Sequence, residues 1–514
     1  MSKRTESFFR RILILFLGIF MILALFGCQQ EEQPAEAVSE DYGGDNEVIE
    51  DDTQNDTPEY IETYLRTKID VTYNSIYEGT LYPKGKARLL VIPVEIDGGD
   101  PMDDAFFDRV DQWIGGPYDN EFCPDLRQYY LNASYGQFDF DYDVMPVYRL
   151  NVSLEEWTSG ERLKTFKYIY LYKAVSDTVD RYVSDPSVYD SDGDGYLDGV
   201  ICITNEPYEV EYVSGCPRVS DDIAEAAGTG KAIMRMHVAT MVHCFDDAND
   251  YSDNVLAHEL AHAFGIDDYY DHNYMNSFAG YYDLQAFNYG DWNPFSKMAV
   301  GWIDPYVITP DVEKVTIKLR NSAEYPDAIL IPCGEWNGTP FDEYLLVDVF
   351  ADRGNNELPF TPAYFDYDSS DDDGGVRVYH VDARLMRRTY YTGEGLGWYT
   401  DFGESRRYSK FDVCQAYSNN TLSSTEKMDD SPDKNIEYHL ITLVTASGNK
   451  VEIGQNFRNS YLFHTGDVFT PEKYSSFFPN YPLSNKHENI DYRITVDSFD
   501  NETKEAIITI EKIH

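Results

Sequence analysis

The segment His258–Asp268, which reads HELAHAFGIDD, constrains the fold of this chain more than any other part of it. Residues i and i+4 of a helix lie on one face, so His258 and His262 can present two imidazoles to one metal ion. Glu259 lies beside them and can reach a metal-bound water without being a ligand itself. Gly265 can end the helix in a left-handed conformation, after which the chain turns back. The segment therefore predicts a zinc site on a helix.

The third zinc ligand is predicted to be Asp268. One large class of zinc enzymes takes a Glu from a following helix, but no Glu occurs between Ala263 and Val312. The compact HExxHxxGxxD spacing places Asp268 at the ligand position, and its neighbour Asp267 is an alternative that the sequence leaves open. Two imidazoles and one carboxylate leave a fourth position for water, which is the catalytic form of a zinc site.

A surface helix that happens to carry two His and one Glu is the simpler alternative. The residues around the motif argue against it, because they give the helix an apolar side: Val255, Leu256, Leu260 and Phe264. We therefore expect the helix to be buried in the core of a domain.

A second metal motif is the segment Asp190–Asp198, DSDGDGYLD, which matches the first nine positions of a calcium loop. The predicted calcium ligands are four carboxylates and one backbone carbonyl: Asp190, Asp192, Asp194, Asp198 and, through its carbonyl, Tyr196. Position 12 is Ile201, not Glu, and a strand is expected to follow. The loop thus predicts a structural calcium site and no EF-hand switch, with an ion-free acidic turn as the alternative. We expect the acidic cluster Asp366–Asp373 to be a solvated loop.

The N-terminus is typical of a bacterial lipoprotein precursor. A basic start precedes the apolar stretch Ile12–Phe26, which is too short for a comfortable membrane span. The letters LFGC at 25–28 resemble a lipobox, so we predict a signal peptide over residues 1–27 and a lipid on Cys28. An uncleaved anchor helix is the alternative. Residues 28–58 are rich in Asp and Glu without Lys or Arg, which predicts a disordered acidic tether on the outer cell surface.

The formal net charge of −50 restricts the partners of this chain. A surface this acidic does not attract nucleic acid or anionic lipid electrostatically. Membrane contact is therefore expected only through the lipid anchor. The oligomeric state cannot be inferred. Six cysteines follow Cys28, and in an oxidising compartment they allow up to three disulfides or buried free thiols: Cys123, Cys202, Cys216, Cys244, Cys333 and Cys414.

Hydrophobic patterns divide the rest of the chain into an α+β region over 59–304 and an all-β, sandwich-like region over 305–514. In the first region we expect strands at 87–96, 199–204 and 232–244 and helices at 103–114 and 163–183. Within 125–138 we expect a helix that ends at a Gly turn and leads into a strand. The strand at 232–244 is expected to be a sheet edge that pairs with extended peptides. In the second region we expect strands at 315–319, 343–350, 375–381, 438–445, 492–496 and 505–510, with long loops or insertions over 366–375 and 387–433.

With these residues in view, the chain resembles the immune inhibitor A family of secreted zinc metallopeptidases over most of Ala87–His514. Besides the two metal motifs, the resemblance rests on YYLNASYG at 129–136, NPFSKM at 293–298, Gly301–Trp302 and GVRVYHVD at 375–382. It implies a metzincin-like catalytic domain, a following β-sandwich, endopeptidase activity on proteins or peptides, and calcium for stability. His258, His262 and Asp268 would then be zinc ligands and Glu259 the general base.

Three features depart from the family pattern. The family usually has a Met in a turn beneath the zinc, where this chain has Gln285. The long pro-segment of the family is absent, since only residues 59–86 separate the tether from the first expected strand. A lipid anchor replaces free secretion.

Some roles stay open at this level. Four tyrosines are candidates by position to hold a reaction oxyanion, and none is ranked above the others: Tyr269, Tyr270, Tyr281 and Tyr282. His237 and His243 are expected to face solvent or a neighbouring residue, with a ligand role as the alternative. His272 is expected to be structural, and His380 carries no metal-partner spacing. The rival functions are a catalytically weakened surface binding protein or adhesin on the same fold, a zinc-dependent glycan or cell-wall hydrolase, and a calcium-dependent structural surface protein.

Overall fold

A computed structural model of the chain describes residues 66–67, 80–115, 125–159, 163–207, 215, 219, 221–241, 252–270, 278–280, 283–288, 290–356, 374–390, 398–400, 413–415, 419, 438–451 and 459–513. All of them belong to one compact unit, Thr57–His514. The predicted signal peptide, Cys28, the tether and the Asp366–Asp373 cluster lie outside the described residues. Among the described helices, none has the length and apolar character needed to cross a membrane.

A parallel sheet organises the first region. Its strands pair in the order β2-β1-β4-β5, β3 also pairs with β1, and each of these pairs is parallel. The strands are β1 (Gly85–Asp97), β2 (Phe138–Val144), β3 (Tyr148–Ser153), β4 (Val200–Thr204) and β5 (Val238–Met241). Parallel strands need crossover connections, and those connections supply the helices that cover the sheet.

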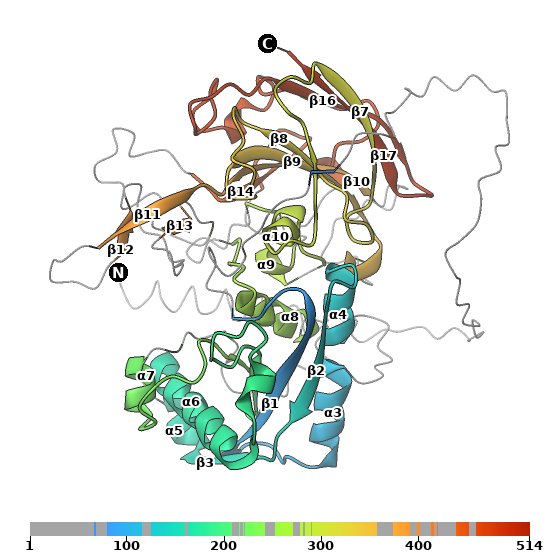
Figure 1. The fold of residues 1–514 in the computed structure, drawn as a ribbon. Coiled ribbons are helices and arrows are strands. Elements are labelled where there is room, and N and C mark those ends of the chain that lie inside the picture. Colours follow the sequence, from blue (N-terminus) through green and yellow to red (C-terminus); the bar gives the residue numbers. More distant parts are fainter. Residues whose placement is uncertain are drawn as a thin grey trace, which may run out of the picture. The chain divides into compact units, whose positions relative to one another are not determined.

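Helices cover both faces of this sheet (Figure 1). Leu89 and Val91 of β1 face a core shared with α3 (Asp104–Ile114), α4 (Leu126–Ala133) and α8 (Ser252–Ala263). Leu90 and Ile92 face the opposite core, shared with α5 (Leu154–Ser159), α6 (Leu163–Tyr182) and α7 (Asp221–Ala226). This alternation explains why β1 is apolar almost throughout, since both of its faces are buried.

Local sequence signals account for most of these boundaries. The predicted strand at 87–96 corresponds to β1, and the predicted helices at 103–114 and 163–183 correspond to α3 and α6 within one residue at each end. The segment 125–138 contains α4 and the first residue of β2, as expected. Asp103 and Asp125 cap α3 and α4, because their carboxylates accept from the backbone N–H of Phe106 and Gln128.

The predicted edge strand pairs with the chain itself at one residue. The strand predicted over 232–244 is described as β5, Val238–Met241, only. At Ala239 the backbone N–H and C=O exchange hydrogen bonds of 2.9 and 3.1 Å with Gly215 in an antiparallel bridge. At Ala239, therefore, the chain's own backbone pairs with the outer edge of β5, and pairing of a peptide with the rest of that edge stays a prediction.

Two sheets pack face to face in the second region. One has the order β14-β10-β9-β8-β6 and the other the order β15-β16-β17-β7. Their strands are β6 (Tyr306–Val307), β7 (Lys314–Arg320), β8 (Ile329–Pro332), β9 (Glu343–Ala351), β10 (Gly374–Asp382), β14 (Ile441–Val444), β15 (Val468–Phe469), β16 (Tyr492–Asp500) and β17 (Glu505–Lys512). Apolar residues of both sheets share one core, as in a sandwich. Part of the loop expected over 387–433 is instead a small sheet of β11 (Leu385–Tyr390), β12 (Trp398–Thr400) and β13 (Val413–Gln415).

Strand β9 contributes to the cores of both regions, and all of its residues are buried. Leu345 and Val347 face the sandwich core. Tyr344 and Leu346 face the core that also contains the apolar side of α8. Packing is therefore continuous across residue 304, where the sequence pattern changes, and the sheet of β9 and β10 forms one wall of the core around α8.

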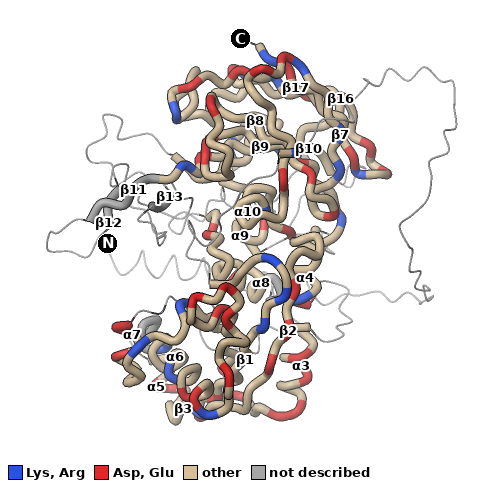
Figure 2. The backbone as a smooth tube through the Cα atoms, viewed as in Figure 1, with Lys and Arg blue, Asp and Glu red and all other residues tan. Residues whose placement is uncertain are grey.

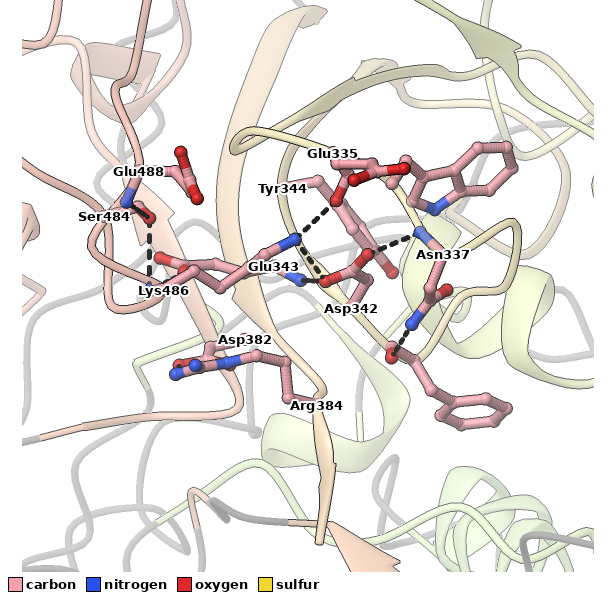
Figure 3. A network of polar contacts seen from close by, with 12 residues as sticks. Glu335, Asn337, Asp342, Glu343, Tyr344, Asp382, Arg384, Ser484, Lys486 and Glu488 are labelled. Atoms are coloured by element: carbon pink, nitrogen blue, oxygen red, sulfur yellow. Dashed lines mark hydrogen bonds and ion pairs between the residues drawn. The ribbon is translucent and has the colours of Figure 1, made fainter.

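A polar network fastens the 484–488 turn to the start of β9 (Figure 3). The Lys486 ammonium donates to the Asp342 carboxylate at 2.8 Å and to the Glu335 carbonyl at 2.7 Å. The buried Glu343 carboxylate accepts from the backbone N–H of Asn485 and Lys486 and pairs with His380 at 2.9 Å. His380 thus has a buried carboxylate partner within the second region.

Two of the six cysteines follow the second of the two alternatives that the sequence left open, buried free thiols instead of disulfides. Cys202, on β4, and Cys333 are buried free thiols. Burial raises the pKa of the Cys202 thiol to about 12, so it is an inert core residue. The geometry of the other four cysteines lies outside the described side chains.

Candidate metal centre

Helix α8 carries the zinc motif and is buried as its apolar side predicts. Leu256 and Leu260 are 2% and 0% exposed, and Phe264 packs beside them in the core. The helix ends as expected at Gly265, whose φ is 85°, and the N–H of Ile266 bonds back to the Ala261 carbonyl at 3.3 Å. This turn reverses the chain and brings residue 268 back to the helix.

The three predicted zinc ligands converge. The Nε2 atoms of His258 and His262 lie 2.9 and 3.4 Å from Oδ1 of Asp268. With metal–ligand bonds of roughly 2.0–2.2 Å, a tetrahedral site separates neighbouring ligand atoms by about 3.3 Å. The observed spacing fits a small tetrahedral cation. Asp268, and not its neighbour Asp267, belongs to this cluster.

Backbone carbonyls orient both imidazoles. Nδ1 of His258 donates to the Leu284 carbonyl at 2.9 Å, and Nδ1 of His262 donates to the Ile266 carbonyl at 2.7 Å. A proton on Nδ1 leaves the Nε2 lone pair of each ring directed at the ligand position. Metal-binding histidines are held in this way by an acceptor behind the ring.

The electrostatics of the cluster favour a cation. Burial lowers the pKa of His258 and His262, but the Asp268 carboxylate more than offsets it, and the pKa of His262 rises to about 9. Burial raises the pKa of Asp268, yet the two imidazoles bring it well below its usual value. A buried carboxylate between two imidazoles is therefore stabilised by positive charge, which zinc would supply.

Glu259 and Tyr270 border the ligand cluster. Oε2 of Glu259 lies 3.9 Å from His262 Nε2, which is close to the ligand position but outside the ligand set. The Tyr270 ring stacks on His258 with its centroid 6.4 Å away. Burial, Asp268 and Glu259 raise the pKa of the Tyr270 phenol, which keeps it a hydrogen-bond donor. Tyr269 instead is buried, with its hydroxyl 2.6 Å from Ser296, and Tyr281 and Tyr282 lie outside the described residues.

Gln285 lies beneath the site in α9 (Leu284–Phe287), next to the residue that orients His258. Its side chain is fully buried, and neither amide atom has a hydrogen-bond partner. His237 is buried on β5's N-terminal side with its ring 6.4 Å from that of Tyr168, and it is not part of either metal cluster. His243 and His272 lie outside the described residues.

The predicted calcium loop follows the short helix η1 (Pro186–Tyr189). Carboxylate oxygens of its four aspartates lie within 4.8 Å of one another: Asp190, Asp192, Asp194 and Asp198. Positive φ angles at Gly193 and Gly195 produce the sharp turn. Asp190 accepts from the backbone N–H groups of Gly193 and Gly195 at 2.7 and 2.9 Å. The ring of Tyr196 lies under Arg235, and the ligand role of its carbonyl stays a prediction.

Asp198 shows the strain of gathering these carboxylates. Burial raises its pKa to about 7, Ser191 opposes the shift, and Asp190 and Asp192 add to it. Carboxylates that repel one another at this range are stabilised by a divalent cation, and oxygen donors of this kind suit calcium.

A cavity of about 240 Å³ lies in the second region and contains none of the predicted site residues. Its lining includes Phe278, His380, His439 and Lys450, and the Phe278 and His439 rings stack at 3.7 Å. Metal-ligating groups of the described residues converge at the histidine cluster and not in this cavity, so the histidine cluster is the candidate site.

No protein-family model matches this chain, and no curated protein shows significant similarity to it. The resemblance to immune inhibitor A peptidases therefore stays a prediction.

Proposed function

We propose that this chain is a zinc-dependent endopeptidase, anchored to the outer surface of a bacterial cell by a lipid on Cys28. The convergence of His258, His262 and Asp268 at tetrahedral ligand spacing, beside Glu259, carries the proposal. When bound, zinc supplies a Lewis acid and lowers the pKa of a water molecule to about 7. The proposed substrates are extracellular proteins or peptides.

The chain's own residues then move one proton. Glu259 accepts it from the water that attacks the scissile carbonyl carbon, and returns it to the amine as the C–N bond breaks. We propose that the Tyr270 phenol donates a hydrogen bond to the developing oxyanion, and the stacking of its ring on His258 beside the cluster supports this role.

We propose calcium as the structural ion of the Asp190–Asp198 loop. The loop is continuous with β4, which lies next to β5 in the central sheet. A rigid loop at that position would stabilise the sheet without taking part in the reaction.

The acidic surface is consistent with extracellular partners and with the absence of nucleic acid among them. Asp and Glu are distributed over both regions, interspersed with fewer Lys and Arg (Figure 2). Negative charge on this scale keeps the protein soluble and repels anionic polymers.

Casein cleavage by the purified mature chain, residues 28–514, tests the proposal. We expect cleavage in calcium buffer, loss of cleavage with a zinc chelator, and loss of cleavage in Glu259→Ala while that variant still binds one zinc. A folded, zinc-loaded chain that cleaves no protein would contradict the proposal. Digestion of peptidoglycan instead would favour a glycan hydrolase, and binding of a surface protein without cleavage would favour an adhesin.

A further inference from the structure

Helix α9 holds the zinc ligand set from two sides. The carbonyl of Leu284 accepts from Nδ1 of His258 at 2.9 Å. The next carbonyl, that of Gln285, accepts from the backbone N–H of Tyr269 at 2.8 Å, directly after Asp268. This one short helix therefore fixes both the first imidazole and the backbone beside the carboxylate ligand.

A single buried carboxylate fixes α9 in turn. Asp283 is 0% exposed. Its Oδ1 caps α9 by accepting from the N–H groups of Gln285 and Ala286 at 2.9 and 3.1 Å. Its Oδ2 accepts from the backbone and side-chain N–H groups of Asn293 at 2.7 and 2.8 Å. Asn293 caps α10 (Pro294–Ala299), so Asp283 joins the starts of the two helices.

Helix α10 continues this connection into the second region. The Lys297 ammonium, 0% exposed, pairs with Asp291 at 2.5 Å and donates to the Ser322 carbonyl at 3.1 Å. The Ser322 hydroxyl donates to Asp348 of β9 at 2.5 Å.

Asp348 forms a buried bidentate ion pair with Arg377 of β10. Fully buried charged groups that satisfy one another in this way have few alternative arrangements.

We propose that Asp283 is a positioning residue for the metal ligands. Its contact with Asn293 at the start of α10, and the contacts of Lys297 in the same helix that lead to Asp348 and Arg377, make the β9–β10 sheet part of the metal centre's support. The inference rests on the proposed function, since it concerns zinc. It assigns the second region a role at the metal centre, although none of its described residues belongs to the ligand cluster.

The test measures the zinc dissociation constant of the mature chain by competition with a chromogenic chelator. Each carboxylate oxygen of Asp283 accepts from two N–H groups. Asp283→Asn keeps the size of the side chain, but its amide NH2 replaces one of these acceptors and faces two N–H donors. We expect zinc affinity to fall on the order of tenfold or more, as for other partners that orient ligands. Asp348→Asn, at the far end of the contacts, is expected to weaken zinc binding in the same direction.

Glu206→Gln is the matched control. Glu206 forms an equally buried ion pair with Lys167 at 3.0 Å, on the α6 side of the central sheet. This variant should lower the melting temperature of the metal-free chain without changing zinc affinity.

Zinc affinity within twofold of wild type in folded Asp283→Asn and Asp348→Asn would overturn the inference, and so would an equal loss in Glu206→Gln. If Asp283→Asn does not fold, Asp348→Asn decides. A wild-type chain that binds no zinc would instead overturn the proposed function.

Discussion

The two metal clusters of this chain are built in opposite ways. The histidine cluster is largely buried, and one of its imidazoles, His258, is oriented by the carbonyl of Leu284 from another segment. The aspartate loop spans nine consecutive positions, and its carboxylates accept from the loop's own backbone N–H groups. Tertiary structure therefore positions the first site, whereas the second is a local turn. The two sites should respond differently to substitution.

The largest difference should come from removing one ligand of the histidine cluster. In His262→Ala we expect zinc affinity to fall on the order of a thousandfold, since a few ligands share a binding free energy of roughly 10–16 kcal/mol. The fold should persist, because the apolar side of α8 is unchanged. Zinc content of the dialysed chain, together with its circular dichroism, measures both. Retention of one zinc by folded His262→Ala would show that the cluster is not the zinc site.

Calcium should act on stability, not on chemistry. At a free calcium concentration 100 times its dissociation constant, binding to the native loop adds about 2.7 kcal/mol to the free energy of unfolding. Calcium should therefore raise the melting temperature of the wild-type chain but not that of Asp190→Asn. The zinc dissociation constant of the variant should match wild type. An equal rise in melting temperature with calcium in both chains would show that the Asp190–Asp198 loop is not the calcium site.

His237, a buried histidine outside both clusters, shows by contrast what hydrogen-bond partners contribute to the histidines of the zinc cluster. His237 is as buried as His258 but has no acceptor at either nitrogen, and burial lowers its pKa to about 3. Its folded pKa lies below the unfolded value of about 6.5, so stability is present above pH 6.5 and lost as pH falls toward 3. At pH 5 this loss amounts to about 2 kcal/mol.

In His237→Phe that part of the acid sensitivity should disappear. Urea unfolding at pH 7 and pH 5 measures the free energy of unfolding of both chains. The difference in this free energy between wild type and variant should be larger at pH 5 than at pH 7. If His237→Phe loses as much free energy of unfolding between pH 7 and pH 5 as the wild-type chain does, His237 does not remain neutral in the folded chain.

The same contrast explains what could be predicted from the sequence. The spacing of His258 and His262, the turn at Gly265 and the aspartates of the loop are local patterns, and local geometry follows from them. The role of Asp283 depends on Asn293 and on a distant sheet, so no spacing signals it. The antiparallel bridge of Gly215 to Ala239 was missed for the same reason, because pairing partners are a tertiary choice.

The smallest effect should come from the floor of the histidine site. The Gln285 amide is fully buried without a hydrogen-bond partner, and an unsatisfied buried polar group costs about 1–3 kcal/mol. Met has a similar volume and no such group, so Gln285→Met should raise the free energy of unfolding by about 1 kcal/mol. Zinc affinity should change little, because the backbone carbonyls of α9, not this side chain, hold the ligands. Urea unfolding and chelator competition on the same preparations measure both quantities. A less stable Gln285→Met chain would show that the amide is satisfied, and weaker zinc binding would give the side chain itself a role in the site.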